Sequence, residues 1–425
     1  MSGVVQLRVG AARVDITPEG AVSMAGFASR TTPSQGVYRP LHLRVALFES
    51  VVDGERRRAL IASADLLTWG PERVDAIRER IEAATGVPAA AQLLAATHSH
   101  SGPQATRWMA PSVGVADPGY LRLLEERLLE AAGIAEAALE PVRPSRHRGR
   151  FDLCGYRRRR LDGPPPADDE LGPRDTEVTA VVLRSPGGDP VATLVHYTCH
   201  PVINDDPLLT DEYPGAAMGS IEEGAGGTAL FLQGCCGDVN PLAAHRAGPE
   251  QALAQGRRLG DVVLGMLGAD GEELEAAPVG GRRRTIDLPL RGMPGEAEIA
   301  AACDLPGVRG EWGRALRSHP ERVRGAMPLE LQRVDLARDL GLLAINAEVS
   351  VEYGLEAKRR SGGAILPVAY SNGTVGYTPT AGQLANGGYE AEESTLYYVL
   401  PSTYDPEIDP RIRAGIGAMI DEAAT

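Results

Sequence analysis

The feature that most constrains the fold is the return of short apolar runs separated by helical patterns. Between positions 58 and 97, the run RALIASADLL is followed by GPERVDAIRERIEAAT (70–85) and then by AQLLAAT. Apolar residues spaced three and four apart predict a helix, and short apolar runs predict buried strands. This order is typical of a βαβ-like unit, so we expect a layered α/β protein with a mixed β-sheet core and flanking helices.

The same patterns continue along the chain. A second helix is expected at 118–139, and more strands are expected at 43–50, 178–185, 190–198, 228–234 and 340–349. A chain of 425 residues with 43% hydrophobic residues can bury a substantial core. With no internal repeat to divide it, we predict one large domain over residues 1–425.

Two segments interrupt these patterns. Residues 161–177, LDGPPPADDELGPRDTE, are rich in proline, glycine and acid, and strand patterns resume directly after them, which predicts a surface loop. Residues 291–338 look helical and polar. We interpret them as a helical insertion, or lid, that covers a site.

Composition restricts the partners. The formal net charge of -14 argues against nucleic acid and acidic membranes as partners, which usually require a basic surface. The first residues, MSGVVQLRVGAARVDITP, lack the pattern of a signal peptide, and no apolar run approaches the ~20 residues of a membrane span. The odd count of five cysteines fits reduced thiols. We therefore expect a cytoplasmic protein.

Two histidine pairs follow strand-like runs. His98 and His100 in THSHSGP would project to one face of an extended segment, where they could hold a metal, move protons or simply end a buried strand. His196 and His200 in HYTCHP follow another run. The proline after His200 favours extended geometry there. We interpret His196 as structural.

Two further motifs carry candidate groups. FLQGCCGDVNP (231–241) runs into a glycine-bracketed turn, in which Asp238 and Asn240 could face a ligand or Asp238 could cap the turn. Glu348 emerges from the apolar run AINAEVSVEYG. A carboxylate in such surroundings needs a partner, either a metal or an arginine.

Taken together, six motifs resemble the neutral/alkaline, non-lysosomal ceramidase family in its N-terminal catalytic domain. They occur in the family's order across nearly the whole chain: ARVDITP (12–18), THSHSGP (97–103), CHP (199–201), GCCGDVNP (234–241), AEVSVEYG (347–354) and GYTPTAGQLANGGYEAEES (376–394). About thirty residues follow the last motif. An immunoglobulin-like domain like the family's C-terminal one needs ~100 residues, so we expect the catalytic domain alone.

The resemblance implies one Zn²⁺ bound by two histidines, a glutamate and a tyrosine. By motif position these ligands match His98, His200, Glu348 and Tyr377. His100 matches the histidine beside the metal, Tyr389 matches a second tyrosine of the site, and Arg157 in GYRRRR matches a substrate-contacting arginine. These last three residues are the implied catalytic groups.

The implied activity is zinc-dependent hydrolysis of an amide bond. Nitrogen and oxygen ligands with an open position suit catalytic zinc, which lowers the pKa of bound water to ~7 and polarises a carbonyl. The chain departs from the family at Asn240, where the ceramidases have serine, and at Glu212, which replaces an aspartate. A serine-dependent step is therefore not expected.

The substrate and some alternatives stay open. With four phenylalanines and three tryptophans the chain has little lipid-facing equipment, so we expect a small, soluble acyl substrate. A zinc esterase or lactonase, a non-catalytic metal-binding homologue and a cysteine hydrolase using Cys199 are the alternatives. Asp65 could orient a ligand histidine, cap a turn or hold a second metal with His100.

Overall fold

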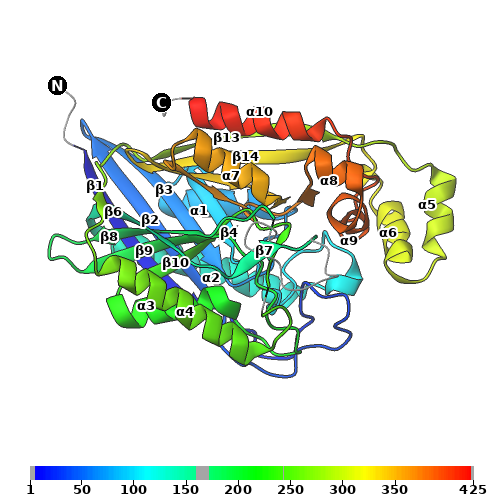
Figure 1. The fold of residues 1–425 in the computed structure, drawn as a ribbon, viewed down its shortest axis with the longest axis horizontal. Coiled ribbons are helices and arrows are strands. Elements are labelled where there is room, and N and C mark those ends of the chain that lie inside the picture. The colour runs from blue at the N-terminus through cyan, green and yellow to red at the C-terminus, as the bar shows by residue number, and fades with distance from the viewer. Residues whose placement is uncertain (1–4, 159–171, 243, 423–425) are drawn as a thin grey trace.

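Three β-sheets form the centre of the molecule, and helices cover their outer faces (Figure 1). A computed structural model describes residues 5–158, 172–242 and 244–422. The first sheet has the strand order β4-β3-β2-β1-β5. Its strands are β1 (Gln6–Asp15), β2 (His42–Val52), β3 (Glu55–Ala64), β4 (Gln92–Ala96) and β5 (Glu140–Pro141).

Two helices belong to this first sheet. Helix α1 (Val74–Thr85) joins β3 to β4, which pair in parallel, so the predicted βαβ-like unit is confirmed. Helix α2 (Pro118–Ala137) packs on β1 and β2. Its start is fixed by Asp117, whose side chain accepts a hydrogen bond from the Tyr120 N–H at 2.7 Å.

The second sheet has the order β10-β9-β8-β6-β12 and combines parallel and antiparallel pairs. Its strands are β6 (Arg143–Arg150), β8 (Glu177–Arg184), β9 (Pro190–Tyr197), β10 (Thr228–Gln233) and β12 (Glu272–Glu273). Helices α3 (Glu212–Ala225) and α4 (Pro249–Leu267) pack together over it. Gly256 allows this close approach, since a Cβ there would lie 2.5 Å from Ala216 Cβ.

The third sheet has the order β13-β14-β15-β17 and lies under α7 (Val351–Arg360) and α10 (Ile408–Asp421). Its strands are β13 (Gly280–Pro289), β14 (Ala326–Ala337), β15 (Leu340–Ile345) and β17 (Ile365–Val368). Two short ladders complete the β-structure. They pair β7 (Cys154–Tyr156) with β11 (Val239–Pro241), and β16 (Glu348–Val349) with β18 (Tyr377–Thr378).

One continuous hydrophobic core joins the three sheets. It contains buried side chains from Leu7 to Met419, and β10 packs against the first sheet while β13 contacts β3 and β14 contacts β4. The predicted fold class, a layered mixed α/β architecture, is therefore confirmed. Within the described residues, no helix is both long and apolar enough to cross a bilayer.

The expectation for residues 291–338 was only half right. Helices α5 (Glu296–Cys303) and α6 (Gly307–Ser318) form there, but Ala326–Ala337 is strand β14 of the third sheet. Met327, Leu329 and Leu331 are buried alternately with more exposed neighbours, the two-residue period of a strand. The helix pair packs through Trp312 against Val399. Residues 161–171 of the predicted surface loop lie outside the described residues.

Candidate metal centre

His98 is held in place just beyond the end of β4. Its backbone has a φ of 64°, the left-handed region, so the extended geometry expected for the His-x-His motif was wrong. Such a conformation costs of order 1–3 kcal/mol and is concentrated at functional sites. The ring stacks on Tyr370 with centroids 3.8 Å apart, and Nδ1 faces the Leu67 carbonyl at 2.8 Å.

His200, three residues beyond β9, brings its ring to the same point. Its Nδ1 faces the Cys236 carbonyl at 2.9 Å, and its Nε2 lies 2.9 Å from His98 Nε2. A carbonyl oxygen only accepts, so each Nδ1 carries the ring proton and each neutral Nε2 presents a lone pair. Two lone pairs this close require a cation or a proton between them.

Glu348 and Tyr377 are placed side by side by the ladder of β16 and β18, in which they are direct partners. Glu348 Oε2 lies 3.5 Å from His98 Nε2 and 3.7 Å from His200 Nε2. This oxygen is buried without a hydrogen-bond partner, whereas Oε1 accepts from the Tyr398 hydroxyl at 2.5 Å. Oε2 is therefore directed at the two imidazoles.

The electrostatics of this cluster favour a negative Glu348 carboxylate beside a neutral His200 ring. Burial opposes ionisation of Glu348, but His98 and the hydroxyls of Tyr398 and Tyr377 outweigh it and lower the pKa of Glu348. Burial, followed by the charge of His98, lowers the pKa of His200 well below its usual value. A neutral imidazole and an ionised carboxylate are the forms that bind a metal.

His100 lies at the edge of the same cluster and lines a cleft of about 510 Å³. Its Nε2 is 3.2 Å from His98 Nε2, which makes a third histidine nitrogen available at this point. Gly26 has a φ of 101°, and a Cβ at this position would lie 2.4 Å from His100 Nδ1. Only glycine allows this approach.

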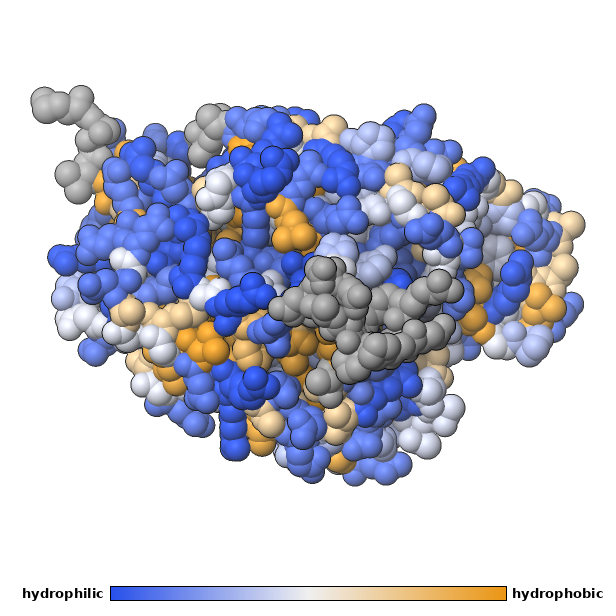
Figure 2. All heavy atoms as spheres, in the orientation of Figure 1, coloured by the Kyte–Doolittle hydropathy of each residue, from blue (hydrophilic) through white to orange (hydrophobic). Residues whose placement is uncertain are grey.

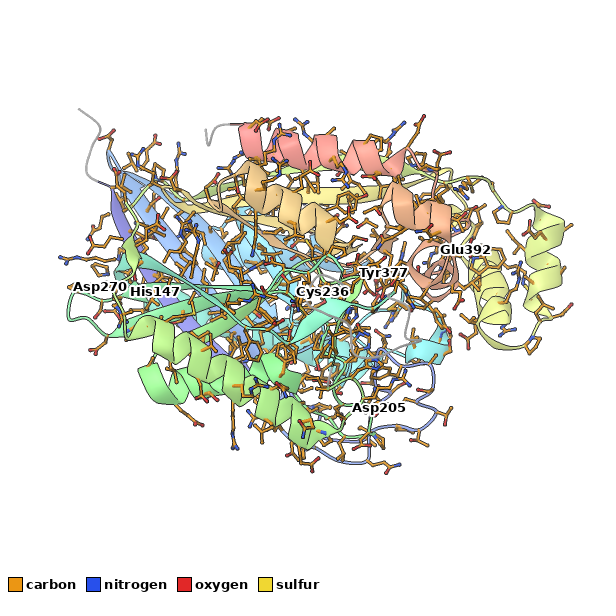
Figure 3. The ribbon with its side chains drawn as sticks, in the orientation of Figure 1. His147, Asp205, Cys236, Asp270, Tyr377 and Glu392 are labelled. Carbon is orange, nitrogen blue, oxygen red and sulfur yellow. The ribbon has the colours of Figure 1, made fainter. Side chains whose placement is uncertain are left out.

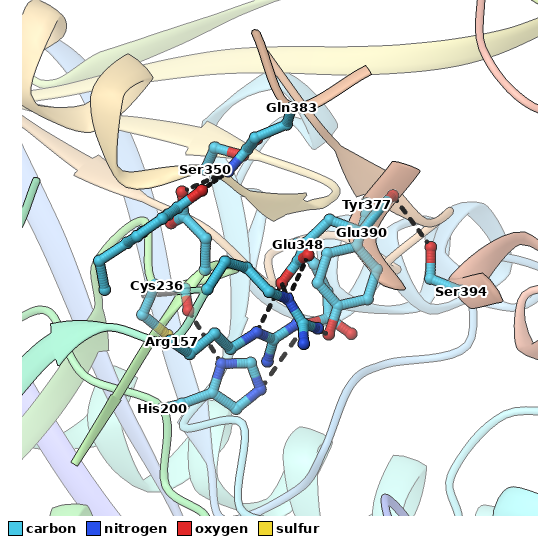
Figure 4. A network of polar contacts seen from close by, with 12 residues as sticks. Arg157, His200, Cys236, Glu348, Ser350, Tyr377, Gln383, Glu390 and Ser394 are labelled. Atoms are coloured by element: carbon cyan, nitrogen blue, oxygen red, sulfur yellow. Dashed lines mark hydrogen bonds and ion pairs between the residues drawn. The ribbon is translucent and has the colours of Figure 1, made fainter. Parts of the chain in front are cut away.

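Arg157 and Tyr389 form another part of the cleft wall. The Arg157 Nε donates to Glu390 Oε1 at 2.6 Å, and Nη2 donates to the Tyr377 hydroxyl at 3.2 Å (Figure 4). The guanidinium also lies 5.4 Å from the ring centroid of Tyr389. Figure 3 places Tyr377 in the middle of the molecule rather than on its rim. Arg157 therefore lies between the buried Glu390 carboxylate and the open cleft.

Other candidate groups have structural partners. The His196 Nε2 faces the Pro367 carbonyl at 2.8 Å, in line with the structural role predicted for it. The Asp238 side chain accepts from the Val351 N–H at the start of α7 and from the Gln383 side chain, so its partners lie on distant segments rather than in the turn that it was expected to cap, while Asn240 lines the cleft. Cys199 is fully buried, and burial raises the pKa of its thiol well above the usual range, which leaves no reactive thiolate.

A second group of possible ligand atoms, from His42, Asp65 and Asp211, lies apart from His100. Arg44 pairs with Asp65 at 3.4 Å, and Arg39 pairs with Asp211 at 2.8 Å. Each of the two carboxylates thus has a guanidinium partner, although burial still raises the pKa of Asp65 to about 7. Asp65 accepts from the His42 backbone N–H, and the Nδ1 of His98 faces the Leu67 carbonyl. Asp65 therefore does not orient His98.

The seven residues that the family resemblance implied for the site lie together at the cleft. These residues are His98, His100, Arg157, His200, Glu348, Tyr377 and Tyr389. Sequence reasoning missed Tyr398, Tyr370 and Gly26. The sequence offers one hint for Gly26, which is a glycine in the segment MAGFAS. It offers none for the two tyrosines.

Comparison with known proteins adds information at the level of the fold. No protein-family model and no curated sequence matches the chain. The crystal structure of neutral ceramidase from Pseudomonas aeruginosa matches it with a TM-score of 0.76 at 20% identity, over 98% of this chain and 74% of that one. A ceramidase complexed with C2 matches with a TM-score of 0.75 at 17% identity, over 99% of this chain and 77% of that one. The chain therefore has the neutral ceramidase fold.

Proposed function

We propose that this protein is a zinc-dependent hydrolase that cleaves the amide bond of a small, soluble N-acyl compound. The observation that carries the proposal is the convergence of the His98 and His200 Nε2 atoms, 2.9 Å apart, with the unpartnered Oε2 of buried Glu348. The solved structures with this fold are described as ceramidases, and a ceramidase hydrolyses an amide.

The donor set suits zinc. We assign His98, His200, Glu348 and Tyr377 as the residues that hold the ion. Two neutral imidazoles and two oxygen donors match the nitrogen and oxygen preference of catalytic zinc. The Nδ1 contacts to backbone carbonyls fix each ring in the orientation that metal-binding histidines require.

The cleft residues around these ligands supply the remaining chemistry. Zinc, when bound, supplies Lewis acidity toward water and the substrate carbonyl. His100 faces the cleft and is the group that accepts a proton from attacking water and returns it to the leaving amine. Arg157 and Tyr389 are the donors that stabilise negative charge as it develops on the carbonyl oxygen.

The surface supports a soluble substrate rather than a membrane lipid. Hydrophilic side chains cover most of the described face in Figure 2, and apolar ones form small separate groups. The exposed large hydrophobic side chains of the described residues belong to separate segments of the chain: Val37, Val115, Ile134, Met293 and Leu305. None of these five residues lines the cleft, so the exposed large hydrophobic side chains of the described residues do not gather around it.

Elemental analysis combined with an amidase assay tests the proposal. We expect about one zinc per chain, loss of activity with a chelator and recovery with zinc. His98→Ala and Glu348→Ala are expected to lose both the ion and turnover. His100→Ala is expected to keep the ion and lose rate by ~10²–10⁴, the usual contribution of a general acid–base. His319→Ala, at an exposed position, is the matched control.

The alternatives give different outcomes in the same assays. Faster cleavage of matched esters than of amides indicates an esterase or lactonase. Loss of activity on thiol alkylation, with none on chelation, indicates the cysteine mechanism through Cys199. Tight zinc binding without turnover of any acyl compound indicates a non-catalytic homologue. Turnover by a metal-free His98→Ala protein contradicts the proposal.

A further inference from the structure

The wall of the cleft carries arginine and histidine but no acid among its described residues. Arg157, Arg158 and Arg246 line it, together with His100, His200 and His245. The protein as a whole has a net charge of -14. A cationic cleft in an acidic protein focuses a local positive potential that attracts an anionic ligand.

The carboxylates behind the wall do not cancel this charge. Arg157 and Arg158 both donate to one residue, Glu390, so two guanidiniums share the hydrogen bonds of one carboxylate, and the charge of buried Glu348 acts on Arg157 as well. The side chain of Arg158 is 40% exposed, whereas that of Glu390 is 3% exposed. The carboxylate is therefore shielded from the cleft, and a guanidinium is presented to it.

Arg246 stands out at the mouth of the cleft. Its backbone has a φ of 54°, a left-handed conformation that a non-glycine residue adopts only where the surroundings enforce it. Its guanidinium lies 5.0 Å from the ring centroid of Phe27, and its side chain is 47% exposed. The carboxylate that it meets, Asp205 Oδ2, is 3.9 Å from Nε, at the outer limit of an ion pair.

Arg30 places a second guanidinium near Arg246. It lies over the same Phe27 ring at 5.1 Å, and its donors face the backbone carbonyls of Ala25, His100 and Asp206. The charges of Asp205, Asp206 and Glu212 act on Arg30 without a direct ion pair among the described residues. The mouth of the cleft thus places two guanidiniums near one aromatic ring, and their hydrogen-bonding edges are not taken up by a close carboxylate.

We infer that the substrate carries a carboxylate, which Arg246 binds at the mouth of the cleft while the amide reaches the histidine cluster. This inference rests on the proposed function and specifies its substrate class as an acidic N-acyl compound. A planar guanidinium is the side chain best suited to bidentate recognition of a carboxylate. The carboxylate can belong to the amine portion or to the acyl portion.

Two matched substrate pairs distinguish a carboxylate on the amine portion from one on the acyl portion. N-hexanoylglycine is compared with N-hexanoylpropylamine for a carboxylate on the amine side, and N-succinylpropylamine with N-pentanoylpropylamine for one on the acyl side. For one pair, we expect the acidic member to have a KM lower by about tenfold to a hundredfold, the range of one charge-assisted hydrogen bond.

Variants assign the preference to Arg246. Arg246→Gln is expected to remove the preference for the acidic substrate by raising KM for that substrate alone. Its kcat, and both constants for the neutral substrate, should stay unchanged. Arg246→Lys is expected to retain part of the preference. Arg257→Gln, at an exposed position of α4, is the matched control and should behave as the unmodified protein. Equal cleavage of acidic and neutral substrates, or equal losses on both in Arg246→Gln, overturns the inference.

A binding measurement separates this inference from the proposed function. Calorimetry with N-hexanoylglycine and with N-succinylpropylamine should show, for one of the two, binding to the metal-loaded protein that Arg246→Gln weakens by about tenfold or more. Binding without turnover supports the anion site and contradicts the hydrolase proposal. Turnover of neutral amides without binding of either acidic compound supports the hydrolase and overturns the anion site.

Discussion

Tyr398 determines which oxygen of Glu348 faces the histidines. Its hydroxyl binds Oε1 at 2.5 Å, which leaves Oε2 directed at the imidazoles. We predict that Tyr398→Phe weakens zinc affinity by about 10–100-fold, the usual effect of losing a group that orients a ligand. Competition with a chromogenic chelator measures this directly.

The matched control for this substitution is Tyr404→Phe. Tyr404 is equally buried, but its hydroxyl has no hydrogen-bond partner, so its removal should leave zinc affinity unchanged. Equal weakening in both variants would show that the effect comes from packing rather than from the bond to Glu348.

Single residues also show how far sequence reasoning reaches. His98, His200 and Glu348 could be singled out as candidates because each follows a strongly apolar run, and the family resemblance then implied their role as ligands. Tyr398 and Tyr370 could not, because a tyrosine contributes to this site only through the position of its ring or hydroxyl in three dimensions. The left-handed φ of His98 is likewise invisible in a pattern of hydrophobicity.

At the scale of elements, strand β9 contains a histidine whose ionisation affects stability. Burial, followed by the charge of Lys358, lowers the pKa of His196 to about 3, whereas an unfolded chain has the ordinary value near 6.5. The folded protein therefore keeps this ring neutral while the unfolded chain takes up a proton. The neutral His196 ring therefore costs no stability above pH 6.5. As the pH falls from 6.5 toward 3, protonation of the unfolded chain lowers the free energy of unfolding.

We predict that this coupling appears in the slope of stability against pH. Between pH 6 and pH 4.5, the free energy of unfolding should fall more steeply in the natural protein than in His196→Gln, by about 1.4 kcal/mol per pH unit. Glutamine keeps a donor for the Pro367 carbonyl but does not titrate. Urea titrations at several pH values give the comparison, and parallel slopes would contradict it.

Elements were predicted best where their pattern was local. The runs at 58–67 and 91–97 and the helix at 70–85 correspond to β3, β4 and α1, because burial on one sheet face or helix face sets their period. Strand β14 was taken as part of a helical insertion, because α5 and α6 precede it directly and charged residues interrupt its alternation. The order of strands in the sheets depends on contacts between distant segments, which no local pattern contains.

At the scale of the whole molecule, the candidate metal centre brings together residues that follow strands of all three sheets. His98 follows a strand of the first sheet, His200 one of the second, and Glu348 one of the third. We predict that free zinc at 100 times its dissociation constant stabilises the fold by about 2.7 kcal/mol over the metal-free protein. Thermal unfolding with increasing zinc checks this, and Glu348→Ala should show no such shift.

The scattered origin of the site also sets the order of events during synthesis. Its side chains enter the chain between His98 and Tyr398, so they cannot all meet before the ribosome has translated past Tyr398. A nascent chain halted before Tyr377 exposes both ligand histidines but lacks the strand that pairs with Glu348. We therefore expect the proposed metal loading to follow translation of this part of the chain.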